Sequence, residues 1–341
     1  MSNTDPNAGD RPTDESSVFN IVSDADPLTR KERLYRWLDI HLFTPYRIIR
    51  SDWRASFGIA MIALFVLVGT VVVRFTPYPR VGDHPRYAPP FQSLSYPLGT
   101  DYGGRAILPQ LIHATPDMLI IAFSGAVVAM SIGVVIGIVA GYKGGYWDEV
   151  LMGISDVVIC IPGLPLVIVI VAIFAPDSPW MVGFILAIDN WPGLARALRS
   201  QVLTIREESY IEAGRAMGRN SGEILWDDVL PQLMPYITIR SAGAARGVIF
   251  QSVGLYFIGV LPASGLNWGV MMEEAYNTGS AVSNPGHAGH WLFAPMIVLL
   301  LMSMSLILLS QGLDRIFNPR LRARHEKTAS EKDDLDADLH S

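Results

Sequence analysis

Blocks of apolar residues long enough to cross a lipid bilayer constrain the fold of this chain more than any other feature. A helix needs about 20 predominantly apolar residues to span the hydrocarbon core. Only 17% of the residues are charged and 50% are hydrophobic, whereas soluble domains carry about 25% charged residues. Because backbone amides in lipid must be satisfied within their own segment, apolar blocks of this kind predict helices. We therefore expect an all-α integral membrane protein.

Six segments reach or approach the length of a transmembrane helix, and we expect one span from each. The fourth is interrupted by Asp189 and Pro192, and the fifth contains Arg240 and Arg246. The six segments are residues 57–75, 118–141, 150–174, 180–198, 237–261 and 291–309.

The basic residues predict the orientation, since they favour the cytosolic side of a membrane protein. With a cytosolic N-terminus, the basic clusters fall inside and the loop 262–290, which has no Lys or Arg, falls outside. We expect both termini in the cytosol. The expected organisation is a disordered N-terminus (1–28), an amphipathic interfacial helix (29–54), the first span with an outer loop (55–115), a core transmembrane domain with a cytosolic loop at 200–235 (116–312) and a cytosolic tail (313–341).

The longest cytosolic loop, with its central part at residues 200–235, has the pattern of two short helices. Gly218 can end the first helix by adopting a left-handed conformation. Asn220 and Glu223 have capping-box spacing and would start the second. Pro231 and Pro235 limit how the chain re-enters the membrane. Because a simple connection needs no such structure, the loop predicts a docking surface.

The same loop resembles the EAA motif of ABC import permeases, in which Glu-Ala-Ala is followed by Gly and later by Leu-Pro. Glu212, Ala213, Gly218, Leu230 and Pro231 match that motif, and Gly214 stands at its third small position. Further segments in family order are Leu98-Gly99-Thr100-Asp101 with Gly104-Arg105, Gly141-Tyr142 to Gly145 with Asp148, Asp156 and Pro162, Trp191-Pro192-Gly193 with Ala195-Arg196, Asn267-Trp268-Gly269, and Gln311-Gly312-Leu313 with Pro319-Arg320-Leu321. Together they resemble the dipeptide/oligopeptide/nickel permease family, in its C-type subunit, over about residues 30 to 325.

This resemblance implies a type I ABC importer permease of the MetI-like fold, in the cell membrane of a prokaryote. A second homologous permease, two ATPase subunits and an extracytoplasmic solute-binding protein would be its partners. ATP and Mg would bind to the ATPase subunits, since this chain has no GxxxxGK[ST] phosphate loop. The chain itself would have no catalytic residue and no cofactor. The residues implied in ATPase coupling are Glu212, Ala213, Gly214, Gly218, Asp228, Leu230 and Pro231.

The transported solute is left open by the sequence. Charged residues inside spans are costly and often functional, although a buried ion pair or an interfacial anchor is an equally good interpretation. The outer stretch 259–281 departs from the peptide permeases and is similar to archaeal relatives associated with oligosaccharide uptake, and the acidic composition suits a salt-adapted source. Peptides, oligosaccharides and, more distantly, a nickel chelate remain candidates. The expected path residues are Arg246, Gln251, Ser252, Tyr256, Asp189 and Trp268.

Other sequence patterns suggest further functions or contacts, on weaker grounds. His287 and His290 could bind a metal, but they lie in a Gly/Pro turn without a carboxylate or Cys nearby. An ion-coupled secondary transporter using Asp189 and Arg246 would be expected to show inverted repeats, and we find none. Aromatic residues around the last outer loop fit either an interfacial belt or stacking on sugars. The GxxxG pair Gly133 and Gly137 predicts close helix packing, inside the subunit or between subunits.

Overall fold

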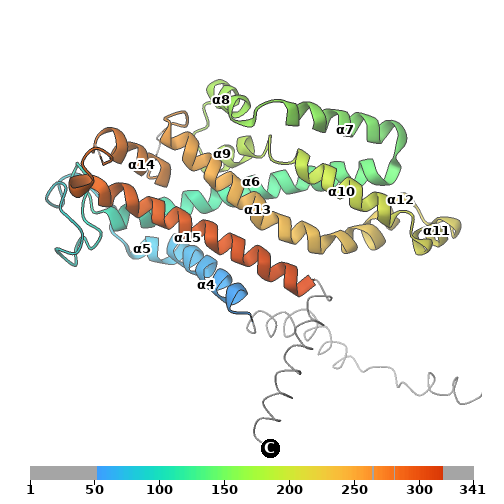
Figure 1. Ribbon diagram of the computed structural model, residues 1–341, viewed down its shortest axis with the longest axis horizontal. Helices are drawn as coiled ribbons and strands as arrows, with labels where there is room; N and C mark the ends of the chain where they lie inside the picture. Colours follow the sequence, from blue (N-terminus) through green and yellow to red (C-terminus); the bar gives the residue numbers. More distant parts are fainter. Residues whose placement is uncertain (1–51, 263–264, 280, 318–341) are drawn as a thin grey trace, which may run out of the picture. The chain divides into compact units, whose positions relative to one another are not determined.

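The computed structural model describes residues 52–262, 265–279 and 281–317. Within these residues the regular elements are helices, joined by loops (Figure 1). Thr100 and Ala106 form an isolated backbone bridge that belongs to no sheet. The predicted all-α fold is therefore confirmed. The expected N-terminal segment, the interfacial helix up to residue 51 and the tail beyond residue 317 lie outside the described residues.

Three long apolar helices correspond to the first, second and sixth expected spans. The first is α4 (Trp53–Leu67), which continues through a π-helical turn (Val68–Val72) into α5 (Val73–Phe75). The second is α6 (Ile107–Lys143) and the third is α15 (Pro285–Phe317). Each has a stretch of mean hydropathy 2.6. Within the described residues, three helices are thus long and apolar enough to cross a membrane, or four if one bent pair is counted.

That bent pair covers the expected third span, residues 150–174, which therefore has a break that was not predicted from the sequence. Helices α7 (Gly145–Cys160) and α8 (Gly163–Phe174) meet at an angle of 90°. Pro162 lacks an N–H group and disfavours helical geometry in Ile161, whose ψ is 126°. The expected fourth span is also broken, into α9 (Pro179–Leu186) and α10 (Pro192–Ile205). The count of six spans stays a prediction.

The loop expected in the cytosol, residues 200–235, and the fifth expected span are continuous in the structure. After α11 (Ser209–Ala216), α12 (Ser221–Ile224) passes through a π-helical turn (Leu225–Val229) into α13 (Leu230–Phe257). Pro231 lies in the first turn of α13, where no N–H group is needed, so the helix runs on through it. The short helix α14 (Trp268–Asn277) then leads toward α15.

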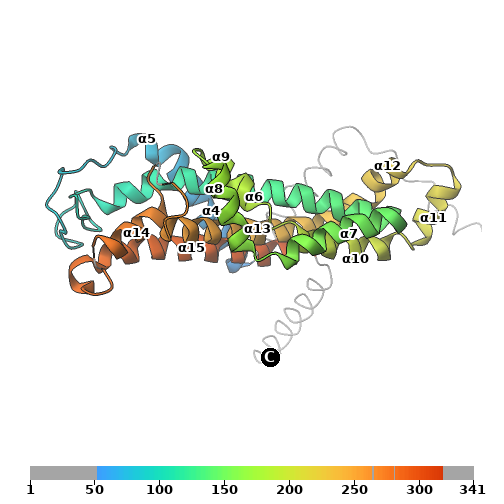
Figure 2. The same ribbon diagram turned by 90° about the horizontal axis from the view of Figure 1, so that it is seen from above.

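Helix α6 forms the centre of the packing and contacts α9, α10 and α13, while α15 packs on α4 and α13 (Figures 1 and 2). The small residues of α6 make this close approach possible. A Cβ atom at Gly137 would lie 2.5 Å from the Ala195 carbonyl oxygen, and one at Gly141 would lie 2.7 Å from Val202 Cβ. The GxxxG stripe is therefore a contact inside the subunit, between α6 and α10.

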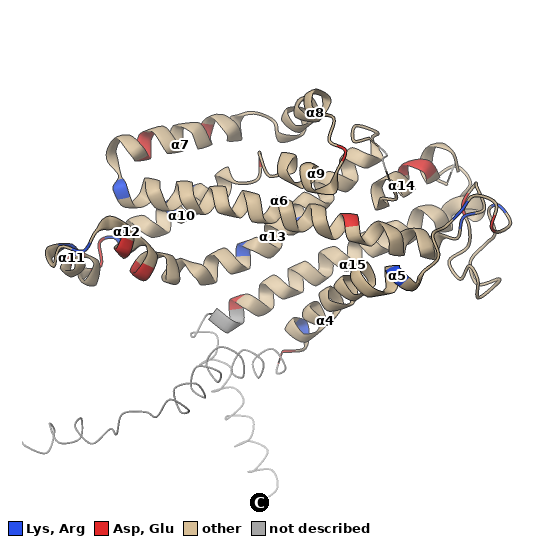
Figure 3. Ribbon diagram, turned by 180° about the vertical axis from the view of Figure 1, so that it is seen from behind, with Lys and Arg blue, Asp and Glu red and all other residues tan. Residues whose placement is uncertain are grey.

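The helices place two different regions at opposite ends of the long bundle. Helices α11 and α12 lie at one end, and α14 lies at the other beside the loop of residues 76–106, which we call the outer loop (Figures 1 and 2). Figure 3 shows the charged residues gathered at these two ends, with few on the long helices between them. This distribution fits a bundle whose middle lies in lipid.

Candidate coupling surface and polar groove

The break between α11 and α12 has the local geometry that the sequence predicts. Gly218 has a φ of +80°, in the left-handed region where glycine is favoured. Asn220 caps α12: its Oδ1 accepts a hydrogen bond from the Glu223 N–H at 2.8 Å, and its Nδ2 donates to Glu223 Oε1 at 2.8 Å. The prediction of two helices with a cap at Asn220 is confirmed.

One face of this helix pair is buried against the ends of α6 and α10. Ile211 of α11 and Ile224 of α12 are fully buried, and they join a core cluster with Leu198 of α10 and Ile138 of α6. Val229 and Leu233 continue this face from the π-helical turn into α13. Helices of four to eight residues are not stable alone, so this apolar contact holds the pair in place.

Two arginines of the loop form polar contacts that were not predicted from the sequence. Arg215 lies over the ring of Tyr142, and its Nε donates to Tyr142 Oη at 3.3 Å. Arg219 donates from Nη1 to Asp228 Oδ2 at 2.7 Å and from Nη2 to Asp227 Oδ2 at 3.0 Å. These two bonds give Asp228 a partner in its own chain and connect the loop between α11 and α12 to the π-helical turn. The Arg and Asp residues of the loop indicate that ion pairs form there, but the sequence does not show which residues pair.

The opposite face of the pair is exposed. The side chains of Met217 and Trp226 are 75% and 71% exposed, although both are large and apolar. Glu212 and Ala213 are exposed too, and within the described residues the Glu212 carboxylate has no hydrogen-bond or ion-pair partner. Of the other expected coupling residues, Gly214 is buried, Leu230 is half-buried and Pro231 is exposed. We call the exposed residues 212, 213, 217, 218 and 226 the coupling surface.

Ion pairs connect α7 to α10 and explain two of the sequence segments named above. Arg199 binds Asp148 through two hydrogen bonds, Nε to Oδ1 at 2.5 Å and Nη2 to Oδ2 at 2.6 Å. Arg196 forms a second ion pair with Asp156. The carboxylates of the Gly-Tyr segment are therefore the partners of the arginines that follow Trp191.

A polar cluster lies where the two interrupted spans approach α13. Gln251 of α13 donates from Nε2 to Asp189 Oδ2 at 3.0 Å, and Asn190 donates from Nδ2 to Asp189 Oδ1 at 3.0 Å. Asn190 Nδ2 also donates to Gln251 Oε1 at 3.0 Å. The cluster faces a groove of about 540 Å³, which we call the polar groove; its lining residues are Leu164, Asp189, Asn190, Gly247, Phe250, Gln251, Gly254 and Ile258.

The other expected path residues lie elsewhere. Arg246 is exposed on α13 and is not part of the groove lining. Ser252 is buried and donates to the Ile249 carbonyl oxygen at 2.8 Å. Trp268 is fully buried, with its ring 6.1 Å from that of Phe65. Tyr256 is 8% exposed and lines a smaller pocket of about 140 Å³ near Asp117 and Asn267. The sequence did not single out Asn190.

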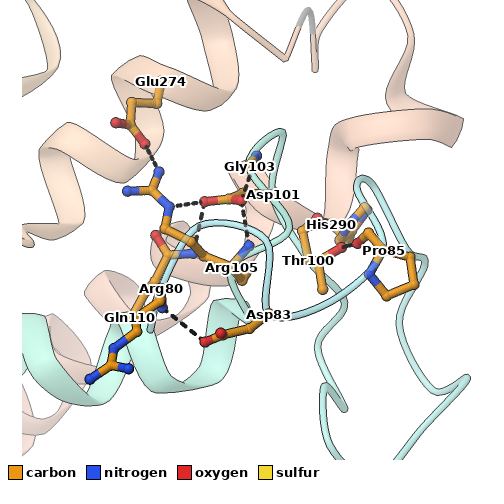
Figure 4. A network of polar contacts seen from close by, with 10 residues as sticks. All are labelled: Arg80, Asp83, Pro85, Thr100, Asp101, Gly103, Arg105, Gln110, Glu274 and His290. Atoms are coloured by element: carbon orange, nitrogen blue, oxygen red, sulfur yellow. Dashed lines mark hydrogen bonds and ion pairs between the residues drawn. The ribbon is translucent and has the colours of Figure 1, made fainter. Parts of the chain in front are cut away.

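The outer loop is held by a buried carboxylate (Figure 4). Asp101 is fully buried and accepts hydrogen bonds from the Gly103 and Arg105 N–H groups, both at 2.8 Å, from Arg105 Nε at 2.5 Å and from Gln110 Nε2 at 3.1 Å. Arg105 Nη2 then donates to Glu274 Oε2 of α14 at 2.8 Å. Burial raises the pKa of the Glu274 carboxyl, and the Arg105 charge opposes that shift.

The two histidines weighed as metal ligands have other neighbours. The His290 Nε2 atom lies 3.1 Å from the Thr100 carbonyl oxygen (Figure 4). The His287 ring lies 4.3 Å, between centroids, from the ring of Tyr87. Both therefore contact the outer loop from the start of α15.

Comparison with known proteins gives the family. Residues 133–323 match the family described as "Binding-protein-dependent transport system inner membrane component". The chain is 27% identical to the oligopeptide transport system permease protein OppC of Lactococcus lactis subsp. cremoris, over 78% of this chain and 90% of the relative. It is 29% identical to the dipeptide transport system permease protein DppC of Bacillus subtilis, over 81% and 85%.

Two further similar proteins were found, a permease and a solved structure. The glutathione transport system permease protein GsiD of Pectobacterium atrosepticum is 30% identical over 68% of this chain and 75% of the relative. An inward-facing structure of the MetNI methionine ABC transporter aligns with a TM-score of 0.46 and 18% identity, over 60% of this chain and 96% of that chain. These comparisons do not support an archaeal or salt-adapted source. The predicted membership of the dipeptide/oligopeptide permease family is confirmed, and the chain belongs to the inner membrane components of binding-protein-dependent transport systems, as a permease subunit of an ABC importer.

Proposed function

We propose that this chain forms half of the translocation path of an ATP-driven peptide importer and is driven through its coupling surface. The observation that carries the proposal is the two-sided character of the α11–α12 pair. Its inner face is fixed to α6 and α10 by buried side chains such as Ile211 and Ile224. Met217, directly after α11, and Trp226, in the π-helical turn after α12, are exposed. An apolar surface at the end of a bundle, next to charged residues, is typical of a protein–protein contact.

The charge of Glu212 supports a partner at this surface. Its carboxylate lacks a partner within the described residues, so a basic side chain of an ATPase subunit could pair with it. Asp228, by contrast, is held by Arg219 and would act by shaping the loop. The ATPase subunits would bind ATP and Mg, and this chain would receive the energy of hydrolysis as a movement of α11 and α12.

The remaining assembly follows from the family. A second homologous permease would complete the path, two ATPase subunits would bind the two coupling surfaces, and an extracytoplasmic protein would deliver the solute. We propose six spans in the cell membrane with both termini in the cytosol. The bent pair α7–α8, the broken pair α9–α10 and the helix α13 would then supply the third, fourth and fifth spans.

Peptides are the solute that the relatives favour. OppC, DppC and GsiD are named as oligopeptide, dipeptide and glutathione permeases. Aromatic rings do not decide the question, because Trp268 and Trp291 in the last outer region are fully buried whereas Tyr276 is 51% exposed. We place peptides ahead of oligosaccharides and nickel chelates on the names of these relatives.

Co-purification tests the coupling surface directly. The chain is expressed with its partner permease and its ATPase subunits, and Met217→Asp is compared with the wild type. We expect Met217→Asp to reduce recovery of the ATPase subunits at least fivefold, because a charge would be buried in an apolar contact. Leu94→Asp is the matched control, since Leu94 is 99% exposed in the outer loop.

Two outcomes would count against the proposal. Full recovery of the ATPase subunits with Met217→Asp would remove the coupling surface from the ATPase contact. Solute uptake by the purified chain in liposomes without any ATPase would contradict the ATP-driven mechanism itself.

A further inference from the structure

The carboxylate of Asp189 is presented to the polar groove without a counter-ion. Its hydrogen-bond donors are the side-chain amides of Asn190 and Gln251, both neutral. Within the described residues no Lys, Arg or His forms an ion pair with it. Asp189 is half-buried and lines the groove, and an ionised carboxylate inside a membrane-spanning segment is costly unless a cation compensates it. The site is therefore incomplete and suits a cation from outside the chain.

Two interruptions of helical structure meet at this carboxylate. The break between α7 and α8 lies at residues 161–162, and the turn between α9 and α10 lies at residues 187–191. Gly163, the first residue of α8, lies so close to Asp189 Oδ2 that a Cβ atom would collide with it. Non-helical backbone at membrane depth is tolerated where it is buried or lines a water-filled cavity, and transporters place solute sites at such breaks.

The walls of the groove define the chemistry of a ligand more closely. Beside Asp189 they include the amides of Asn190 and Gln251, which bond to Asp189 and to each other, and Asn190 Nδ2 also donates to the Leu186 carbonyl oxygen at 2.6 Å. Leu164 and Phe250 are apolar and are 54% and 44% exposed. A Cβ atom at Gly254 would have no neighbour within 4 Å, so α13 leaves open space at that point. The volume of about 540 Å³ lies within the range of about 300 to 1,000 Å³ that is typical of small-ligand sites.

We propose that Asp189 binds the protonated α-amino group of a peptide in the polar groove. A peptide N-terminus combines a primary ammonium with a side chain, which correspond to the Asp189 carboxylate and to the apolar wall of Leu164 and Phe250. A neutral oligosaccharide would leave the carboxylate uncompensated. This inference rests on the proposed peptide importer and adds to it the end of the solute that this chain recognises.

Uptake of two matched peptides tests the site. The complete complex, with its binding protein, is reconstituted in liposomes with a tripeptide that has a free amino terminus and with its N-acetyl form. Wild type is compared with Asp189→Asn and with the control Glu273→Gln, which makes the same change on α14, where Glu273 accepts a hydrogen bond from Asn277. The rate of each variant relative to wild type is taken separately for each peptide, so that the preference of the binding protein cancels.

We expect Asp189→Asn to lower uptake of the free-amine peptide about tenfold, as expected for the loss of one charge-assisted hydrogen bond. Uptake of the N-acetyl peptide should change less than twofold, and Glu273→Gln should change neither. Equilibrium dialysis of both peptides against the purified complex without the binding protein should give the same contrast. It also provides the comparison if the wild type takes up the N-acetyl peptide too slowly.

Each other outcome overturns the inference in a distinguishable way. An equal loss for both peptides, or no loss for either, would mean that Asp189 does not bind the amino group. Loss of the partner permease from purified Asp189→Asn complex would assign the carboxylate to an ion pair between permeases. Absence of ATP-dependent uptake of any peptide by the wild type would contradict the proposed peptide function itself.

Discussion

Arg215 of α11 lies over the ring of Tyr142 at the end of α6, with its guanidinium carbon 4.8 Å from the ring centroid. The same guanidinium donates a hydrogen bond to the Tyr142 hydroxyl. This contact is a direct polar link between α11, which carries part of the coupling surface, and the central helix of the bundle. A partner that displaces α11 would therefore also move the end of α6 through this contact.

Substitution of Arg215 should loosen that link without unfolding the protein. A cation–π contact at a partly exposed site contributes about 0.5 to 1 kcal/mol. We expect Arg215→Ala to lower ATPase activity stimulated by the loaded binding protein severalfold, with normal membrane insertion. Arg215→Lys keeps a cation over the ring and should retain more activity. Equal stimulation of wild type and Arg215→Ala would show that the link does not transmit movement.

A side chain at Gly218 should destabilise the break between α11 and α12. The residue has a φ of +80° and nothing within 4 Å of a Cβ atom, so Gly218→Ala would add strain without a collision. The expected cost is about 1 kcal/mol, measurable as faster amide hydrogen exchange in α11. Gly193→Ala is the control, because Gly193 lies in the first turn of α10 with open space around it and no positive φ. Similar exchange in both variants would contradict the role of Gly218.

Enlarging Gly137 should separate α6 from α10. A Cβ atom at this position would lie 2.5 Å from the Ala195 carbonyl oxygen, which is backbone and cannot turn away. We expect Gly137→Ala to destabilise the protein by about 1 to 3 kcal/mol, seen as a lower melting temperature in detergent. Gly153→Ala on α7 meets nothing within 4 Å and should leave the melting temperature unchanged or slightly higher. A wild-type melting temperature for Gly137→Ala would argue against this helix contact.

Removal of the Asp101 carboxylate should release the outer loop. It is fully buried and compensates the charge of Arg105, so Asp101→Ala leaves a partly buried cation with fewer partners. The expected loss is about 3 to 5 kcal/mol, with rapid protease cleavage within residues 76–106. Asp83→Ala should change stability by less than about 0.5 kcal/mol, because Asp83 accepts a bond from the Arg80 N–H at an exposed position. Resistance of Asp101→Ala to protease would contradict this assignment.

The sequence could predict those features of the site that depend on neighbouring residues. Gly218 and Asn220 act on their immediate neighbours, so their effect on α11 and α12 can be inferred from spacing alone. Asp189 could be singled out as a charge in an apolar segment, and Gln251 stood among the expected path residues. Their hydrogen bond could not be predicted, because it joins residues 62 positions apart.

For the fold too, local features could be predicted from the sequence and contacts between distant segments could not. Hydropathy identifies apolar segments but averages over the few residues at which a helix bends, so α7 and α8 were expected as one span. The fork of Arg219 on Asp227 and Asp228 and the ion pairs of α7 with α10 also depend on how distant segments meet. Membership of the family could be inferred because its motifs are ordered along the chain, and the structure gives several of them a packing role.

The absence of a side chain at Gly163 has a consequence for the shape of the polar groove. A Cβ atom at this position would collide with Asp189 Oδ2, so glycine allows the start of α8 to lie against the turn at residues 187–191. Leu164, the next residue, and Asp189 can then line the same groove. A single glycine thereby brings two separate breaks in the helices into one wall.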